Sequence, residues 1–452
     1  MTTHWHSYQL FLFTLPLAFG ANTEWAWNLY SATAMIFFSI RAHQLTEDGN
    51  LQSEPIIKNS ILNTVTKASW PLLVLFTVQL WVLCQWLLGI SLTPYDTQMA
   101  LLRGLGYASF FGWTLIELNQ PGRIIRAVWI IVLAAAFQAI YGSLMVMSGL
   151  EYGFFLKKWT YLNYATGTFV NRNHLAGYLE MTTALGIGLL LAQTTHYVGS
   201  WRERMRQFIT MLLSDKVVLR LLLAIMVIAL VMTRSRMGNT AFFVSLSIAG
   251  LMALLLMKNK ARSTTILLTS LMVIDIAIVG TFFGVDKVAD RLQNTTASKE
   301  TRDEVARDTF DMWKTAPLTG IGAGSFVYVY PTFKKTDVNK EVYNNNAHND
   351  YLQFLAEFGA PATLALGSAV LFSLWTAIQA MRKRRSDLHK GMGFASTMGL
   401  IAIGIHSTVD FNLQIPANAY MFVFLMALAF VARWGSSEQP QQRHRPHSRS
   451  SA

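Results

Sequence analysis

His348 has the sequence context expected of a general base. It stands directly before residues 351–358, whose apolar side chains recur at spacings of i, i+4 and i+7 and predict one short helix. We expect Asn349 or Asp350 to cap the N-terminus of this helix, while Gly359 follows its C-terminus. The positive end of a helix dipole disfavours imidazolium, so His348 should be neutral near pH 7, as a general base must be. The alternative is a loop histidine that only hydrogen-bonds its neighbours.

Two polar clusters stand where apolar segments begin or end. Residues 171–174 are Asn171, Arg172, Asn173 and His174, directly before an apolar segment. Such side chains are either helix-capping groups or parts of a site, and their types alone leave both alternatives open. Residues 233–238 form a short turn between two further apolar segments, and this turn holds both Arg234 and Arg236.

A third cluster surrounds Arg302. Residues 299–313 predict a helix lying on the membrane surface, because Ala306, Phe310 and Trp313 recur at helical spacing and leave Arg302 elsewhere on its surface. A glycine-rich run follows this helix.

That run, residues 317–324, has three glycines at alternate positions, which permits tight turns and close backbone approach. A glycine run alone is a weak signal. It is not a nucleotide-binding P-loop, because no Gly-Lys-Ser/Thr sequence follows.

His406 and Asp410 add polar groups at the end of a later apolar segment, where hydrogen bonding of the helix end is their commoner role. Their i, i+4 spacing allows them to share a helix face, but two ligands are too few to hold a metal ion. The chain has no Asp-x-Asp pair, and Cys84 is its single cysteine. We therefore predict neither a metal centre nor a disulfide.

The arginines indicate an anionic substrate. Guanidinium groups present planar forks that suit the oxygens of a phosphate or diphosphate, and Arg172, Arg234, Arg236 and Arg302 would take the place of a metal. A lipid-linked diphosphate fits best, since its apolar tail can lie among membrane spans while its headgroup projects outward. The predicted chemistry is group transfer with the diphosphate as leaving group and His348 as the base.

The composition predicts an all-α polytopic membrane protein. Of 452 residues, 52% are hydrophobic and only 14% are charged. The net charge of +12 requires no nucleic acid, because basic loops bind the anionic lipids of the membrane. About 12 transmembrane helices are expected. The apolar segments lie at 8–21, 25–40, 68–90, 98–117, 127–149, 174–195, 217–232, 239–257, 264–284, 362–380, 391–408 and 418–433.

Lysine and arginine are concentrated on one side of these spans, in the loops at 41–67, 118–126, 196–220, 258–262 and 381–390 and in the tail. The positive-inside rule therefore predicts cytoplasmic N- and C-termini and places the long polar segment on the opposite side. We expect transmembrane helices 1–9 in residues 1–283, a periplasmic loop at 284–361, transmembrane helices 10–12 in 362–434 and a disordered tail at 435–452. No cleavable signal peptide is evident.

Four motifs in this order resemble the O-antigen ligase and polymerase superfamily of bacterial envelope glycosyltransferases. Residues 171–178 resemble its Asn-Arg-Asn-His block, and residues 235–236 are similar to its Ser-Arg turn. Arg302 with residues 317–322 resembles the opening of its large periplasmic loop, and residues 347–352 resemble the close of that loop. The four motifs together are specific, although none is specific alone.

The resemblance covers about residues 171–418. It implies a GT-C-type helical fold and an inverting, metal-independent transfer of a glycan from undecaprenyl diphosphate at a periplasmic site of the bacterial inner membrane, without a cofactor. It implies His348 as the base and Arg172, Arg236 and Arg302 as the groups that hold the diphosphate, with Arg234 as a further candidate. The supporting positions that we expect in the site are Asn171, Asn173, His174, Asn349, Asp350, Tyr351, His406 and Asp410.

The resemblance leaves the acceptor open. Members of the superfamily load O-antigen onto lipid A-core, join repeat units into a growing glycan, or modify proteins as O-oligosaccharyltransferases. We take the ligase type as the first hypothesis and the other two as alternatives. A solute transporter, for example of inorganic carbon, is the alternative from another class. It is less favoured, because Glu180 and Asp275 are the main intramembrane acids and the other polar residues crowd one face.

Overall fold

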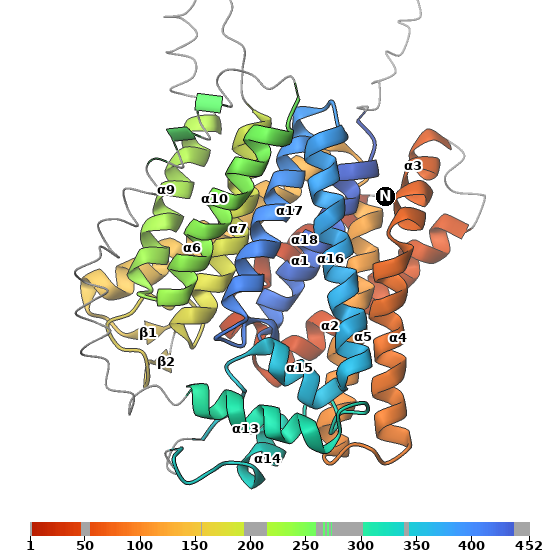
Figure 1. Cartoon of the computed structure of the whole chain (residues 1–452). Helices are drawn as coiled ribbons and strands as arrows, with labels where there is room; N and C mark the ends of the chain where they lie inside the picture. Colours follow the sequence, from red (N-terminus) through yellow and green to blue (C-terminus); the bar gives the residue numbers. More distant parts are fainter. Residues whose placement is uncertain are drawn as a thin grey trace, which may run out of the picture.

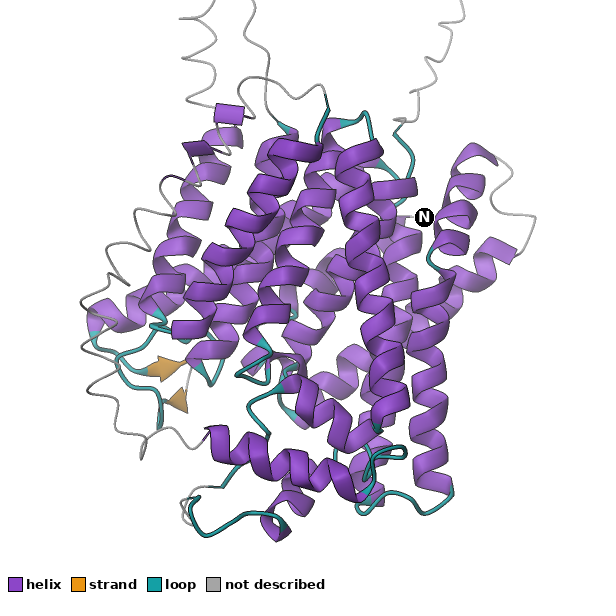
Figure 2. Cartoon of the chain, viewed as in Figure 1, coloured by secondary structure: helices purple, strands orange, loops and turns teal. Residues whose placement is uncertain are grey.

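The computed structural model describes residues 2–46, 55–154, 156–193, 215–258, 302–338 and 343–437, together with residues 265, 266, 269, 270 and 273. Most of the predicted span at 264–284 and the tail beyond residue 437 lie outside these residues. Where the structure describes the chain it is mostly helical, with connecting loops and one short strand pair (Figure 2).

The elements divide into two halves along the chain. The first half comprises α1 (Thr2–Thr14), η1 (Phe19–Ala21), α2 (Glu24–Thr46), α3 (Pro55–Lys67), α4 (Ser69–Leu87), α5 (Pro94–Glu117), α6 (Pro121–Ser148), β1 (Tyr152–Gly153) and β2 (Leu156–Lys157). The second half comprises α7 (Arg172–Ala192), α9 (Asp215–Met232), α10 (Arg236–Leu256), α13 (Arg302–Thr315), α14 (Phe326–Val329), η3 (Tyr330–Thr332), α15 (Asp350–Phe358), α16 (Ala360–Lys383), α17 (Asp387–His406), η4 (Asn412–Gln414) and α18 (Pro416–Trp434).

Six helices among the described residues are long and apolar enough to cross a membrane, namely α4, α6, α7, α10, α16 and α18. This number does not confirm the predicted 12. The 13 residues of α1 rise only about 20 Å, which is less than the hydrocarbon core of a bilayer. Helices α2, α5, α9 and α17 fall at predicted spans and have 18 to 24 residues, but they carry more charged or weakly hydrophobic residues.

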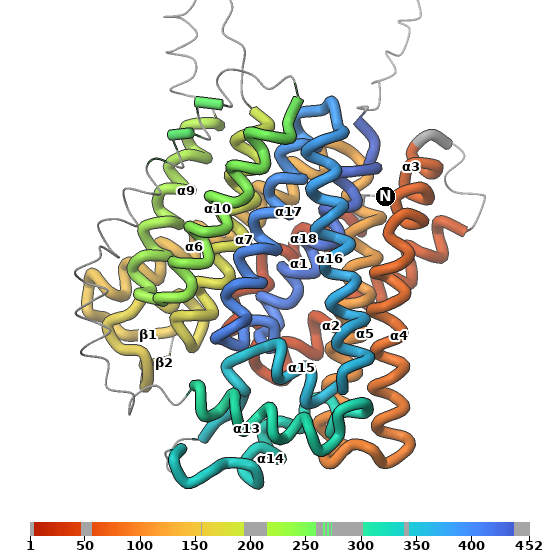
Figure 3. The backbone as a smooth tube through the Cα atoms, in the orientation of Figure 1, coloured from red at the N-terminus to blue at the C-terminus, as the bar shows by residue number. Residues whose placement is uncertain are grey.

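Helices α7 and α17 form the centre of the bundle and pack along each other (Figure 3). Their backbones approach closely where Gly188 faces Gly391, since a Cβ at either position would meet a carbonyl of the other helix. Both helices are buried along most of their length. The polar residues 171–174 and His406 lie at the ends of these two central helices, so they are rigidly supported.

Helices α13, α14 and α15 gather at one end of the bundle (Figure 1). They share a small apolar cluster that includes Val305, Met312 and Phe326. A helix is present at the predicted place as α13, but the apolar face that we expected for it is wrong. Phe310 is 40% exposed, whereas Val305 and Met312 are buried, because α13 packs against α15.

The glycine-rich run clamps the C-terminal end of α15. All three glycines have left-handed backbones, with φ of 66° at Gly320, 109° at Gly322 and 77° at Gly324. The run hydrogen-bonds to the last turn of α15, through Ile321 N to Ala356 O at 3.0 Å. Ala360 N also donates back to a carbonyl at the start of the run, at 2.8 Å. The prediction of tight turns and close backbone approach is therefore confirmed.

Gln85 ties this clamp to the membrane bundle. Its amide Nε2 donates to the carbonyls of Thr319 and Glu357 at 2.7 and 2.9 Å, and its Oε1 accepts from Ala323 N at 3.2 Å. The Glu357 carboxylate accepts from Phe326 N at 3.0 Å, and burial raises the pKa of Glu357 to about 7. The C-terminal end of α15 is thus held by Gln85 of α4 and by the start of α14.

Replacement of Gly320 by alanine should loosen α15. A left-handed residue other than glycine costs about 1–2 kcal/mol, and a Cβ here would also collide with the carbonyl of Glu357. We expect a lower melting temperature of the purified protein. Gly89→Ala is one control, because Gly89 is also left-handed but a Cβ there would meet no neighbour. Gly367→Ala in α16 is a second control with neither strain nor a collision. The melting temperature should therefore fall most for Gly320→Ala, less for Gly89→Ala and least for Gly367→Ala. Equal melting temperatures for the three variants would contradict the clamp.

Candidate active site

His348 is held at the N-terminus of α15, as predicted. Asn349 caps the helix by accepting from Leu352 N at 3.0 Å, and its side chain donates to Thr408 O at 2.9 Å. Gly359 ends the helix with φ of 79°. His348 itself has φ of 51°, a left-handed conformation that is uncommon outside glycine and is met most often in asparagine, aspartate and histidine.

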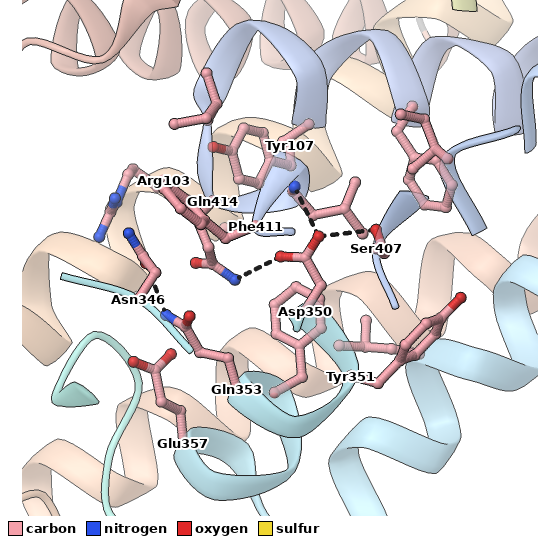
Figure 4. A pocket seen from close by; sticks show the side chains of 18 of the residues that line it. Arg103, Tyr107, Asn346, Asp350, Tyr351, Gln353, Glu357, Ser407, Phe411 and Gln414 are labelled. Carbon is pink, nitrogen blue, oxygen red and sulfur yellow. Dashed lines mark hydrogen bonds between the residues drawn. The ribbon is translucent and has the colours of Figure 1, made fainter. Parts of the chain in front are cut away.

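Asp350 fastens α15 to the loop that follows α17. Its backbone N–H donates to Ser407 O at 3.0 Å, and its carboxylate accepts from Ser407 Oγ at 2.8 Å, Leu413 N at 3.1 Å and Gln414 Nε2 at 3.3 Å (Figure 4). Burial raises the pKa of Asp350 to about 7. Asp350 is therefore an anchor, and Tyr351 beside it is 47% exposed and donates to Gly404 O at 2.7 Å.

Asp410 is the centre on which three histidines converge. Its carboxylate lies 3.8 Å from His174 Nε2, 3.9 Å from His406 Nε2 and 4.0 Å from His348 Nδ1. These are ion-pair distances, too long for direct hydrogen bonds. Asn173 Nδ2 donates to the carboxylate at 2.6 Å. Burial alone would raise the pKa of Asp410, but the three imidazoles and a nearby guanidinium outweigh it and lower the pKa.

Phe411 fixes the orientation of two of these histidines. Its ring meets those of His174 and His348 edge to face, with centroids 4.6 and 4.8 Å apart. The Nδ1 atom of His348 is buried, while the side chain as a whole remains 26% exposed. Burial lowers the pKa of His348 below 6.5, Asp410 opposes this shift, and Arg302 adds to it. Burial thus favours the neutral imidazole.

A second buried pair supports the histidine cluster from within the bundle. His406 Nδ1 lies 2.8 Å from the Glu180 carboxylate, and both side chains are fully buried. Asn418 Nδ2 donates to His174 O at 3.0 Å. The sequence indicates Glu180 only as an intramembrane acid, whereas the fold makes it the partner of His406.

Two of the predicted arginines lie against this cluster. Arg302 donates from its guanidinium to Val409 O at 3.1 Å, directly before Asp410. The Arg172 guanidinium stacks over Tyr164 at 4.0 Å, and within the described residues its buried Nε has no hydrogen-bond partner. Burial and Asp410 raise the pKa of Tyr161, while Arg172 and Arg302 oppose this, so both arginines act on one ring. Arg172 thus keeps a donor without a partner among the described residues, whereas Arg302 also acts on Asp410.

The other two arginines differ in their placement. Arg234 has φ of 50° and lies over the same Tyr164 ring as Arg172, at 5.7 Å. Arg236 is an exposed residue that begins α10, where Ser235 caps the helix by accepting from Gly238 N at 3.2 Å. Asn171 has the same capping role in α7, where it accepts from Asn173 N at 2.9 Å. The capping alternative therefore holds for Asn171, while Asn173 and His174 face Asp410.

In the part of the chain that the structure describes, no group of three or more His, Cys, Asp and Glu side chains has the arrangement that holds a metal ion. The three imidazoles instead surround one carboxylate. Such an arrangement stabilises a buried negative charge and orients the rings.

A cavity of about 870 Å³ opens beside the cluster. Tyr161, His174 and Phe411 line one part of it, and apolar side chains of α4, α16 and α18 line another. Residues of α15 and the preceding loop, including Asn346 and Gln353, form part of its wall (Figure 4). The site therefore combines a polar end with a space suited to an apolar chain.

The sequence does not indicate the roles of Tyr161 and Tyr164. Both lie in the loop before α7, where Arg172 contacts both rings and Arg234 contacts Tyr164. Aromatic partners of arginine have no fixed sequence spacing, so no local signal marks them. Arg103 on α5 also lines the cavity. Its position in the predicted apolar span 98–117 could have indicated a functional residue, because charged side chains are rare in membrane spans.

A family model described as O-Antigen ligase matches residues 221–367. This match confirms the resemblance to the O-antigen ligase superfamily. The matched region includes α10, α13 and α15, and therefore both Arg302 and His348. A search of the curated proteins found no match to the chain. Together with the apolar helices, the match supports a membrane glycosyltransferase of the O-antigen ligase and polymerase superfamily.

The electrostatics of the cluster predict the titration of His348. Diethyl pyrocarbonate modifies neutral imidazole, so mass spectrometry of labelled native protein should give a midpoint below 6.5 for His348. Asp410→Asn should lower the midpoint further, because the carboxylate favours imidazolium, and Arg302→Gln should raise it. The same peptide in unfolded protein is the reference. A midpoint equal to the reference, or opposite shifts in the variants, would contradict this account.

Proposed function

We propose that the protein transfers a glycan from undecaprenyl diphosphate to an acceptor hydroxyl. The observation that carries this proposal is the convergence of His348, Asp410, Arg302 and Arg172 beside a cavity with an apolar part. Such a transfer requires a neutral histidine that can accept a proton and a carboxylate that stabilises the imidazolium formed. It also requires cationic groups, here two arginines, that bind the leaving diphosphate.

In the proposed step, the acceptor hydroxyl oxygen attacks the anomeric carbon of the donor glycan. The bond between this carbon and the diphosphate oxygen breaks, and undecaprenyl diphosphate leaves. His348 takes the hydroxyl proton through Nε2, since its Nδ1 is buried on the Asp410 side. Asp410 then stabilises the imidazolium at 4.0 Å, a distance that a substrate complex can shorten.

The arginines would bind the leaving group. Arg172 and Arg302 are the main candidates, because Arg172 has an unsatisfied Nε among the described residues and Arg302 lies beside Asp410. Arg234 is better supported than Arg236, since it shares the Tyr164 ring with Arg172. Asn173, His174 and His406 position Asp410, and Asn349, Asp350 and Tyr351 position α15.

The proposal includes the membrane topology. We infer a GT-C-type fold of about 12 transmembrane helices in the bacterial inner membrane, with cytoplasmic termini and a periplasmic site on the segment 284–361. In support, the start of α1 and the end of α18 lie at the end of the bundle opposite α13 (Figure 1). The buried pair Arg41 and Glu117 lies at that opposite end, as does Arg384, which donates to Gly435 O at 2.8 Å.

Lipid A-core is the acceptor of the ligase hypothesis, and a growing lipid-linked glycan is that of the polymerase hypothesis. Both acceptors are amphiphiles, which the apolar part of the cavity favours over a protein acceptor. Transport is less favoured, because the histidines of the candidate site gather around Asp410 at one end of the bundle.

His348→Ala should abolish transfer, with a loss of about 100- to 10,000-fold because the general base is gone. The assay uses purified protein with a lipid-linked donor and acceptor, and melting temperature reports folding. His6→Ala is the matched control, because His6 is an exposed histidine of α1. In the wild type, activity should fall only at pH below 6.5, because the lowered pKa keeps His348 neutral above it. Wild-type rates in the His348 variant would remove it from the mechanism.

Arg302→Ala should weaken binding of undecaprenyl diphosphate by about 2–5 kcal/mol, since it leaves an anionic oxygen unpaired in a partly desolvated site. Arg172→Lys should also weaken it, because lysine keeps the charge but loses the planar fork. Arg126→Lys is the control, since Arg126 lies in the first turns of α6 at the opposite end. Unchanged affinity in either site variant would exclude that arginine from the diphosphate site.

Transfer should persist after exhaustive chelation, because the proposed charge balance rests on arginines rather than on a metal. The measurement is transfer by purified protein in EDTA, followed by added magnesium or manganese. Activity lost in EDTA and restored by either ion would overturn the arginine mechanism and make the histidines around Asp410 candidate ligands.

A further inference from the structure

Arg103 is a cation in the cavity wall that the proposed mechanism does not use. It lies in α5 and is partly buried, and its guanidinium stacks over Trp27 at 5.1 Å. Within the described residues it has neither a hydrogen bond nor an ion pair, and Trp27 is its stacking partner. Stacking occupies a face of the planar guanidinium, while the five N–H donors lie in its plane and remain free for a ligand.

The surroundings of Arg103 are those of a polar pocket. In Figure 4 its side chain points to the part of the pocket where Asn346, Gln353 and Glu357 lie. Gln353 Nε2 donates to Asn346 Oδ1 at 3.0 Å, which leaves the Asn346 amide as a donor toward the cavity. Glu357 is occupied by Phe326 N, and Asp96 lies two helical turns away on α5. Arg103 opposes the effect of burial on the pKa of Glu357, but within the described residues it forms no ion pair with a carboxylate.

The same cavity continues from Arg103 between apolar side chains. Leu75 and Val78 of α4, Leu366 of α16 and Val423 and Met426 of α18 line this part. At the other end, His174 and Phe411 connect it with the histidine cluster. A ligand that matches both the apolar lining and the cationic Arg103 has an apolar chain and an anionic headgroup.

From this arrangement we infer that the cavity beside Arg103 binds a phosphate-bearing lipid as the acceptor. The inference rests on the proposed transfer. An inverting transfer needs the acceptor on the face of the sugar opposite the leaving group. If Arg172 and Arg302 hold the donor diphosphate, the cavity on the Arg103 side remains for the acceptor. Arg103 then binds the phosphate of the acceptor, while the hydroxyl of the acceptor lies next to His348.

Two lipids share this chemistry, a phosphorylated acyl-glucosamine disaccharide and a second polyprenyl diphosphate. Native mass spectrometry of the full chain carrying His348→Ala counts bound lipids without turnover. Arg103→Gln should bind the phosphorylated disaccharide about 10- to 100-fold more weakly than the parent protein does. It should bind the dephosphorylated disaccharide with the affinity of the parent protein. With undecaprenyl diphosphate alone, a change from two bound lipids to one in Arg103→Gln would identify the polymerase-type source instead.

Two controls separate recognition from folding. Trp27→Phe keeps the charge but weakens the stacking, and it should leave phosphate-dependent binding unchanged. Arg126→Gln removes a distant charge of the same type. The inference is overturned if neither phosphorylated lipid binds the parent protein, or if Arg103→Gln binds the phosphorylated lipid as tightly as the parent does. It is also overturned if Arg103→Gln loses affinity for the phosphorylated and dephosphorylated disaccharides equally, or if Trp27→Phe reproduces the phosphate-dependent loss.

Transfer assays distinguish this inference from the proposed function. Arg103→Gln should raise KM for the phosphorylated acceptor by about 10-fold or more and leave KM for the donor unchanged. A wild-type protein that binds the lipid through Arg103 but transfers no glycan contradicts the proposed function alone. Normal transfer with an unchanged acceptor KM in Arg103→Gln contradicts the acceptor site alone.

Discussion

The carboxylate of Asp410 is the constraint on which the rest of the site depends. It is 1% exposed, and a charge so deeply buried is tolerated only if other groups compensate it. Groups from distant parts of the chain surround it. Asn173 of α7 donates a hydrogen bond, Arg302 at the start of α13 supplies positive charge, and three imidazoles lie within 4.0 Å. These imidazoles belong to His174 of α7, His406 of α17 and His348 before α15. One buried charge thus brings together the two central helices and the segment that carries the base.

The surrounding packing makes this convergence possible. Helices α7 and α17 approach closely through Gly188 and Gly391, so their polar ends meet at one level of the bundle. The glycine run at 317–324 then presses α15 against α4 through Gln85, and Asp350 fastens its other end to Ser407. Because α15 is held at both ends, His348 at its N-terminus can keep the geometry that proton transfer requires.

Much of this arrangement could be predicted from local sequence. The cap at Asn349, the helix of residues 350–358 and the glycine at its end follow from side-chain types at fixed spacing. The roles of the glycines at 320, 322 and 324 follow in the same way. The exposed and buried faces of α13 could not be predicted, because Phe310 and Val305 are both apolar and only packing against α15 decides between them. The partners of Arg172 and His406 required the fold, since Tyr164 and Glu180 lie on other elements.

The central claim is that the base and the arginines act on one donor molecule. The most direct test is an experimental structure of the inactive His348→Ala protein with a synthetic undecaprenyl-diphosphate glycan. The account predicts the diphosphate within hydrogen-bonding distance of Arg172 and Arg302, with the anomeric carbon facing residue 348. A structure in which no diphosphate contacts Arg172 or Arg302, or in which a metal ion bridges the diphosphate to His174 and His406, would contradict it.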